Sequence, residues 1–373
     1  GSSMIAFHLP KKDFQGFHIV ASHSDSPTYR IKEQPEMSVE KHYTKLNIER
    51  YGGMIPETWF DRPLSVAGRI IIEENGQIKD QLVNIDRDLM IIPNLAIHMS
   101  RSSNESKQLN PQKDLLPLCG GNLTKDAFEE MIAKESGVEK EDILSYDLFL
   151  YNRMRGTTLG INEEFVAAPK LDDLECVYSS IEGMLNAKLS KDYVTVCAVF
   201  DNEEVGSGTK QGAGSTFFPE VLKRISYLCG KNEEEYYMAV ADSFMLSADN
   251  AHAVHPNYQD KTDPTNRPYI NEGIVLKYNA SQKYTTDANS AALVKYLCKK
   301  EKIKCQVFFN SSDMLGGSTL GNILTGQVSI KAADIGLPQL SMHSTYETAG
   351  CKDLDDMITL MGSFYELGKE VQI

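Results

Sequence analysis

The feature that most constrains the fold is a repeated alternation of short apolar runs with helix-like segments. The β-branched runs at 194–200 and 305–310 are typical of buried strands. The segment 171–187 instead has apolar residues at helical spacing, with Leu174, Tyr178, Ile181 and Leu185 on one face. Strands that alternate with helices predict an α/β fold with a mixed, mainly parallel central sheet flanked by helices.

The alternation is interrupted in the middle of the chain. Residues 63–163 have a hairpin-rich pattern, with turn signals near 74–76 and a polar stretch at 100–114 that we expect to be a loop. We therefore predict a discontinuous α/β domain at 1–62 and 164–373, with an inserted smaller β-rich domain at 63–163. Within the α/β part, we expect a further strand over 236–246.

Composition excludes several classes of function. The formal charge of −14 over 373 residues argues against a nucleic-acid-binding protein and against binding to an anionic membrane surface. The sequence also has no apolar run long enough to span a bilayer. Its seven cysteines are scattered, odd in number and without a CxxC pair. This usage is typical of reduced thiols and indicates a cytoplasmic protein.

Acidic residues and histidines gather where predicted strands end. Each pair or single residue is weak evidence alone, because such residues usually cap helices or lie in solvated turns. Together they offer the nitrogen and oxygen ligands that Zn²⁺, Co²⁺ or Mn²⁺ prefer, at the edge of an α/β sheet where sites form. The candidates are His23, Asp25, Asp172, Asp173, Glu203, Glu204, Asp242, Asp249, His252, His255 and His343.

Two divalent ions could be held by five of these residues: His23, Asp172, Glu204, Asp249 and His343. Glu203 would then lie beside the ions without binding them, which is the position that a general base needs. The glycine-rich stretch at 205–214 matches neither GxxxxGK[ST] nor GxGxxG. We expect its glycines to let backbone pass close to the site rather than to hold a phosphate.

Six strings of residues, in order from His23 to Glu347, closely resemble the M18 family of metallo-aminopeptidases, the aspartyl aminopeptidases. They are "HSDSP", "KLDDL", "FDNEEVGS", "SADNAHAVHPNY", "GGSTLG" and "SMHSTYE". The third and fourth strings are very specific, and the resemblance extends over nearly the whole chain. One departure is that "KLDD" stands where many members have RLDN.

The resemblance implies a role for each matched residue. His23 and Asp249 would bind one metal ion, Glu204 and His343 the other, and Asp172 would bridge the two. Glu203 would be the base, and Asp25 would orient His23. The peptide bond after Asp172 would be cis. The metal ions would most commonly be zinc, with cobalt or manganese as alternatives.

The family also implies an assembly and a specificity. The inserted domain would be a dimerisation domain, and dimers would assemble into a tetrahedral dodecamer. His98 would reach the partner's active site, and Lys277 would recognise an acidic side chain, whereas a Lys at a strand edge is ordinarily a surface residue. We assign His255 a substrate or oxyanion role. Members usually begin several dozen residues earlier, so we expect an N-terminal segment to be missing here.

These observations predict a dinuclear metal-dependent aminopeptidase that removes N-terminal residues, preferentially Asp or Glu, from peptides. Metal-activated water would attack the scissile carbonyl, with Glu203 as general base. One alternative is a dinuclear amidohydrolase or deacylase that acts on small molecules. Another is a non-catalytic assembly or cargo-binding protein, although the presence of every ligand together with Glu203 argues against a decayed site.

Overall fold

The structure is a computed structural model that describes residues 1–10, 13–99 and 108–371. The chain divides into two compact units. The first comprises the described residues of Gly1–Ser26, Thr157–Met342 and Glu347–Ile373, and the second comprises those of Pro27–Gly156 and His343–Tyr346. Part of the loop expected at 100–114 lies outside the described residues, and its end forms the short helix α1 (Pro111–Asp114).

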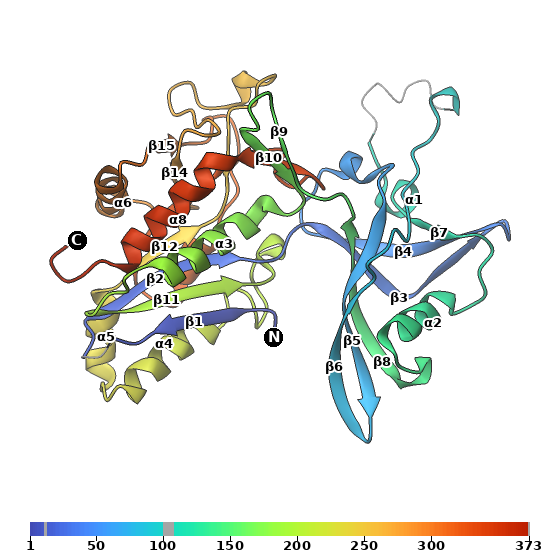
Figure 1. Cartoon of the computed structure of the whole chain (residues 1–373), viewed down its shortest axis with the longest axis horizontal. Coiled ribbons are helices and arrows are strands. Elements are labelled where there is room, and N and C mark those ends of the chain that lie inside the picture. Colours follow the sequence, from blue (N-terminus) through green and yellow to red (C-terminus); the bar gives the residue numbers. More distant parts are fainter. Residues whose placement is uncertain (11–12, 100–107, 372–373) are drawn as a thin grey trace. The chain divides into compact units, whose positions relative to one another are not determined.

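A seven-stranded sheet forms the centre of the first unit (Figure 1). The inner pairs β11–β2, β2–β12 and β12–β16 are parallel, as is β14–β15, whereas β1–β11 and β14–β16 are antiparallel. The predicted mixed, mainly parallel sheet is therefore confirmed. In spatial order the strands are β1 (Met4–His8), β11 (Tyr193–Phe200), β2 (Gly16–His23), β12 (Phe244–Ala248), β16 (Lys331–Gly336), β14 (Ile274–Lys277) and β15 (Cys305–Phe308).

Helices cover both faces of this sheet. One face packs against α3 (Leu171–Asn186), α6 (Ala288–Glu301) and α8 (Cys351–Tyr365). The other packs against α4 (Phe217–Leu228), α5 (Glu233–Ala241) and α7 (Leu320–Gln327). Every residue of β2 and β11 is buried, which explains why β11 is a nearly continuous apolar run rather than an alternating pattern.

One local expectation was wrong. The segment 236–246 is not one strand, because Tyr236–Ala241 completes α5 and only Phe244–Ala248 is extended. A capping box between Asn232 and Glu235, with three acidic residues in the first turn, stabilises the helix start. Asp242 therefore lies before β12 and not at a carboxyl end.

The helix predicted at 171–187 is confirmed as α3, but most of its apolar stripe is exposed. Leu174, Tyr178 and Leu185 are exposed, although their spacing is that of a core-facing stripe. Small or polar residues such as Ser179, Ser180 and Gly183 face the interior instead. A Cβ at Gly183 would lie 2.9 Å from the Cβ of Met361, so this face of α3 is small because α8 packs closely against it.

A five-stranded sheet also belongs to the first unit, and its strands adjoin segments that carry several of the predicted ligands. Its strand order is β13-β17-β18-β10-β9. The bounds are β13 (Ala251–His252), β17 (Pro338–Leu340), β18 (Glu347–Gly350), β10 (Phe165–Ala168) and β9 (Thr157–Leu159).

The second unit has its own core around a six-stranded sheet, in the order β6-β5-β8-β3-β4-β7. It begins at Pro27, so the expected boundary at Pro63 falls inside it. The reason is that β3 pairs with both β4 and β8 in the same sheet. The elements are β3 (Thr28–Val39), β4 (Tyr43–Tyr51), β5 (Leu64–Glu74), β6 (Gln77–Asn84), β7 (Leu118–Gly120), β8 (Ile143–Asn152) and α2 (Ala127–Ser136).

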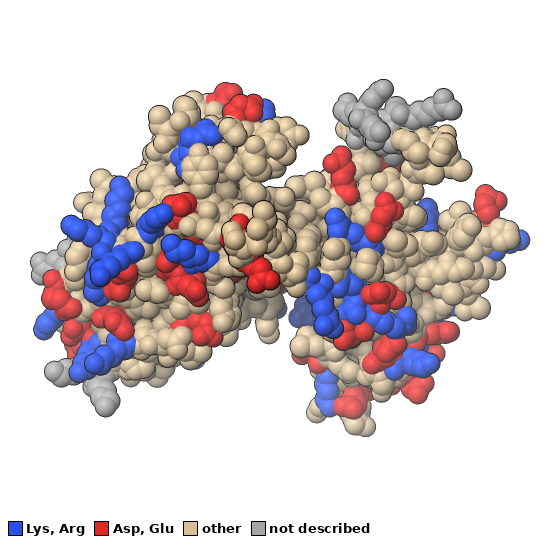
Figure 2. All heavy atoms as spheres, turned by 45° about the horizontal axis from the view of Figure 1, so that its top comes forward, with Lys and Arg blue, Asp and Glu red and all other residues tan. Residues whose placement is uncertain are grey.

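Two observations concern the nucleic-acid-binding and membrane functions against which the composition argued. On the face drawn in Figure 2, Lys and Arg residues are interspersed with Asp and Glu residues in the described parts of the chain. None of the helices in the described residues is both long enough and apolar enough to cross a membrane.

Candidate metal centre

The predicted ligands of the first unit emerge at one edge of the seven-stranded sheet. His23 ends β2, Glu203 and Glu204 follow β11, and Asp249 follows β12. These three strands are parallel neighbours, so their carboxyl ends meet at the same edge. Asp172 joins them from the start of α3, and the peptide bond between Asp172 and Asp173 is cis, as predicted.

The first cluster consists of His23, Asp172 and Asp249, all buried. The Nε2 atom of His23 lies 3.6 Å from Oδ1 of Asp172 and 3.9 Å from Oδ1 of Asp249. One ligand atom from each residue lies within 4.8 Å of the others. An imidazole nitrogen and two carboxylates at this spacing can surround one divalent ion.

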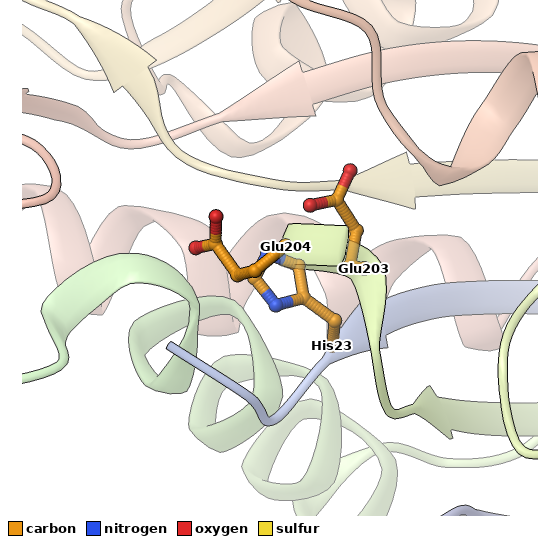
Figure 3. Close-up of side chains that lie close together, drawn as sticks. All are labelled: His23, Glu203 and Glu204. Carbon is orange, nitrogen blue, oxygen red and sulfur yellow. The ribbon is translucent and has the colours of Figure 1, made fainter. Parts of the chain in front are cut away.

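Glu203 and Glu204 form a second cluster with His23, again with ligand atoms within 4.8 Å of one another. The two glutamates lie in the short 3₁₀-helix η5 (Glu203–Val205), entered through a left-handed residue, Asn202. Their carboxylates diverge on the two sides of the His23 ring in Figure 3. A helical turn, rather than the extended backbone expected from sequence, therefore separates the two side chains.

Asp25 links the two clusters. Its Oδ1 lies 3.3 Å from Nδ1 of His23, and its backbone carbonyl lies 3.1 Å from the same nitrogen. The two carboxylate oxygens also accept hydrogen bonds from the backbone N–H groups of Glu203 and Glu204, each at 3.1 Å. Asp25 therefore orients the imidazole and fixes the turn that carries both glutamates.

Two further carboxylates fix the site: sequence reasoning named Asp173 as a candidate without a role, and it missed Glu347. Asp173, which is fully buried, accepts a hydrogen bond from the backbone N–H of His23 at 3.2 Å. Glu347 accepts one from the backbone N–H of Asp172 at 2.9 Å. Both residues stand in strings that support the family resemblance, but neither position by itself indicates which backbone group it holds.

Asp249 is held from two directions. A Cβ on Gly336 would lie 2.1 Å from the carbonyl oxygen of Asp249, so only glycine allows β16 to approach this segment. On the other side, Nζ of Lys277 donates to the carbonyl oxygens of Asp249 at 2.7 Å and of Asn250 at 3.2 Å. Lys277 is therefore a buried residue of β14, not a surface lysine.

The cluster concentrates negative charge in a place that is poorly hydrated. Burial, and then Asp249, raises the pKa of Glu203 to about 7, while burial and Asp172 raise the pKa of Glu204 to about 10. Burial also raises the pKa of Asp249, although Lys277 opposes it. For His23, burial favours the neutral ring, but Asp172 and Asp25 outweigh it and raise its pKa well above the usual value.

This chemistry matches a divalent cation. A buried excess of carboxylate charge is costly unless a counter-charge offsets it, and a bound metal ion would supply the largest one. The donors are nitrogen and oxygen atoms without cysteine sulfur, which suits Zn²⁺, Co²⁺ or Mn²⁺ in a catalytic site.

Three other predicted residues have different surroundings. His343 opens the stretch His343–Tyr346 of the second unit, where its carbonyl oxygen accepts from the N–H of Ile55 at 3.1 Å. His98 is exposed in η2 (Ile97–Met99) of the same unit. His255 lies in the first unit, and its Nδ1 accepts from the N–H of Asn257 at 3.1 Å. The ligand role of His343 and the substrate roles of His98 and His255 stay predictions.

The glycine-rich stretch after Glu204 makes room for backbone. A Cβ on Gly212 would lie 2.3 Å from the carbonyl oxygen of Ser207, so the loop closes on itself at this point. Gly206 has φ of 95°, a conformation that favours glycine at the end of η5.

The fold and the clustered ligands define a class: metal-dependent hydrolases with an α/β fold, whose metal ions lie at the carboxyl edge of the sheet. The model of the family "Aminopeptidase I zinc metalloprotease (M18)" matches residues 1–365. The chain therefore belongs to the M18 family, and it is a zinc metallo-aminopeptidase, a hydrolase that acts on N-terminal residues.

Named relatives agree with this assignment. The chain is 46% identical to a probable M18 family aminopeptidase 2 of Clostridium acetobutylicum, with 98% of this chain and 86% of that protein covered. A Pseudomonas aeruginosa protein of the same name is 37% identical, with 98% and 85% covered.

Solved structures agree as well. A chain in the cryo-EM structure of the Ape4 and Nbr1 complex is 37% identical with a TM-score of 0.94, and 98% of this chain and 74% of that chain are covered. The S. cerevisiae mApe1 dodecamer is 27% identical with a TM-score of 0.83, with 97% and 83% covered.

Proposed function

We propose that this aminopeptidase holds two divalent metal ions, most commonly zinc, and prefers peptides that begin with Asp or Glu. The observation that carries the metal assignment is the cluster of His23, Asp172 and Asp249, whose ligand atoms lie within 4.8 Å of one another. Glu203 and Glu204 share His23 with this cluster, which supports a second ion nearby.

The proposed ligands divide between the two ions. His23 and Asp249 would hold one, Glu204 and His343 would hold the other, and Asp172 would contribute to both. Asp25 holds the ring of His23 and both backbone N–H groups of the glutamate turn, so it orients a ligand to each ion. Glu203 is left unligated and serves as the base.

When bound, the metal ions supply a water of lowered pKa and polarise the scissile carbonyl. Glu203 takes a proton from the attacking water at its carboxylate and passes it to the leaving amine. Carboxylates of the cluster hold the free α-ammonium group of the peptide, which restricts cleavage to the N-terminal residue. His98 or His255 donates a hydrogen bond to the oxyanion.

We also propose a homo-oligomer in which dimers assemble into a tetrahedral dodecamer. The support is the mApe1 relative, whose structure is a dodecamer. The second unit would make the dimer contact and would present His98 to the partner's site. Light scattering coupled to size-exclusion chromatography tests this assembly, and a monomer at micromolar concentration would contradict it. Seven free cysteines suit a reducing compartment, so we place the enzyme in the cytoplasm.

One panel of assays tests the proposed activity. The protein is stripped with a chelator, reloaded with Zn²⁺, Co²⁺ or Mn²⁺, and assayed with chromogenic amides of Asp, Glu, Leu and Lys. We expect activity to return with metal, two ions per chain by elemental analysis, and faster cleavage of Asp and Glu amides. N-acetylated amides serve as the control, because an aminopeptidase needs the free amine. Cleavage of the acetylated amides at equal rates would instead indicate a deacylase or amidohydrolase.

A further inference from the structure

Asn250, which follows the proposed ligand Asp249, has a buried side chain that reaches the start of α3. The residue is 3% exposed. Its Nδ2 atom donates a hydrogen bond to the carbonyl oxygen of Leu171 at 3.0 Å, and Leu171 directly precedes Asp172. One side-chain amide therefore joins the residue after one proposed ligand to the residue before another.

The amide of Asn250 has further partners around the candidate metal centre. Its Nδ2 atom also donates to Oε2 of Glu175 at 3.2 Å and to Oε1 of Gln339 at 3.3 Å, while Oδ1 accepts from the thiol of Cys176 at 3.3 Å. Because the carbonyl oxygen of Leu171 can only accept, the nitrogen of the amide, rather than its oxygen, faces that carbonyl. Partners on α3 and β17 thus hold the side chain in one orientation.

The start of α3 is irregular where it carries the proposed ligand. Asp172 (φ −80°, ψ 111°) and Asp173 (φ −118°, ψ 26°) have non-helical backbone angles, so the helical hydrogen-bond pattern is interrupted at this turn. Partners from elsewhere fix it instead. The N–H of Asp172 donates to Glu347, and its carbonyl oxygen accepts from the hydroxyl of Ser26, each at 2.9 Å. These two contacts do not involve the segment that carries Asp249.

The spacing of the two carboxylates depends on how their backbone segments are held together. The Oδ1 atoms of Asp172 and Asp249 lie 3.6 Å and 3.9 Å from Nε2 of His23. Buried carboxylates repel each other, so these two are driven apart when no cation lies between them. The hydrogen bond between Asn250 and Leu171 opposes that movement at the backbone, one residue away from each carboxylate.

We propose that Asn250 is a positioning residue of the metal centre, which holds the Asp172 and Asp249 segments together at the spacing that a metal ion needs. The proposal rests on the proposed metal-dependent function and names a residue that supports it. Asn250 contacts neither the ion nor the substrate and acts through the two ligands beside it. It therefore contributes to metal affinity, and it contributes equally to every substrate.

The test compares Asn250→Leu and Asn250→Ala in the whole, zinc-loaded chain. Leu fills the space of the amide and excludes water, whereas Ala leaves room for a water molecule that restores part of the hydrogen bonding. Asn271→Ala is the matched control. The Nδ2 atom of Asn271 also donates to a backbone carbonyl oxygen, that of Glu164 at 2.7 Å, but this bond involves neither proposed ligand.

Three quantities are measured for each variant: zinc affinity by competition with a chromogenic chelator, the visible absorption spectrum of the Co²⁺-loaded protein, and the free energy of unfolding in urea. For Asn250→Leu we expect zinc affinity to fall about 10- to 100-fold, the usual effect of removing a partner that orients ligands. Asn250→Ala should lose less affinity, and the Co²⁺ spectra of both variants should change. Asn271→Ala should keep zinc affinity within about twofold and keep the wild-type spectrum, although it also lowers the free energy of unfolding.

A kinetic measurement separates this role from a contact with substrate. At saturating zinc, both Asn250 variants should leave the ratio of kcat/KM for the Asp amide to kcat/KM for the Leu amide within about twofold of the wild-type ratio. A change in this ratio without a loss of zinc affinity would overturn the proposal.

Zinc affinities and Co²⁺ spectra of the Asn250 variants that match those of Asn271→Ala would also overturn it, because the amide would then contribute to folding alone. If Asn250→Leu does not fold, Asn250→Ala decides by the same measurements, since it adds no bulk to the buried site. A wild-type protein that binds no zinc would contradict the proposed function instead, whereas failure of the Asn250 proposal leaves wild-type zinc binding intact.

Discussion

Two buried histidines on β2 show how differently the two ends of one strand are used. His23, at the carboxyl end, is surrounded by carboxylates, and its pKa is raised well above the usual value by Asp172 and Asp25 in spite of burial. His18, near the amino end, is stacked on Tyr193 with ring centroids 4.0 Å apart. Burial lowers the pKa of His18 to about 3.

The difference teaches that burial alone does not make a functional histidine. Among the described residues, His18 has no charged partner to offset the cost of ionisation, so it stays neutral and packs as an aromatic ring. His23 has several carboxylates within reach, so a positive charge at that place is favourable, whether a proton or a metal ion carries it. The histidine at the amino end of β2 thus has a structural role, and the histidine at its carboxyl end belongs to the candidate metal centre.

The largest expected effect tests whether Glu203 acts as the base while its neighbours hold the metal ions. Glu203→Gln removes the proposed base while keeping the size of the side chain. We expect kcat to fall about 10²- to 10⁴-fold at unchanged zinc content, because general bases contribute about this much. Steady-state kinetics with elemental analysis measure both quantities, and Glu220→Gln, at an exposed position of α4, is the control. Near-normal kcat in Glu203→Gln would falsify the base assignment.

A smaller effect is expected for the carboxylate that orients the ligands. Asp25→Ala leaves the Nδ1 atom of His23 and the N–H groups of the glutamate turn without this carboxylate. We expect zinc affinity to fall about 10- to 100-fold, the usual effect of removing such a partner. Chelator competition measures it. Unchanged affinity would show that packing alone holds the imidazole and the turn.

The contributions of the two ends of β2 to folding stability should also depend on pH with opposite signs. In metal-free protein, the raised pKa of Glu203, about 7 against 4.5 unfolded, means that the folded state binds more protons between these values. The pKa of His23 is also raised, so His23 likewise lowers the stability of the folded state as pH rises above 6.5. Metal-free protein should therefore lose stability as pH rises from about 5 to 8. Zinc should flatten this trend, which chemical denaturation at several pH values measures.

The smallest expected effect concerns the amino end. Because the pKa of His18 falls from 6.5 to about 3 on folding, its contribution is complete above pH 6.5 and is lost progressively as pH falls toward 3. His18→Phe should remove this loss, which amounts to about 2 kcal/mol by pH 5. Denaturation of wild type and variant at pH 7 and pH 5 measures the difference. An equal loss in both proteins would contradict a neutral, structural His18.

Sequence reasoning worked best where the signal was local and repeated. The strand β11 was predicted at 194–200 because both of its faces are buried and nearly every residue is apolar. It failed at α5, where apolar residues follow a charged helix start, whereas at α3 it predicted the helix but not which face packs inward. In both places the decisive contacts, the capping box and the close packing of Gly183 against Met361, involve residues that periodicity does not weigh.

By itself, the sequence determined the fold class and the family, and it placed the proposed ligand residues at the carboxyl ends of β2, β11 and β12. These follow from strand order along the chain, because parallel strands bring their carboxyl ends to one edge. Tertiary structure alone decided how the remaining charges are used. It turned Lys277 inward to two carbonyl oxygens and placed the Asp173 carboxylate at the backbone N–H of His23. The physical reason is that the use of a charge depends on the partners that burial gives it, and the sequence does not specify them.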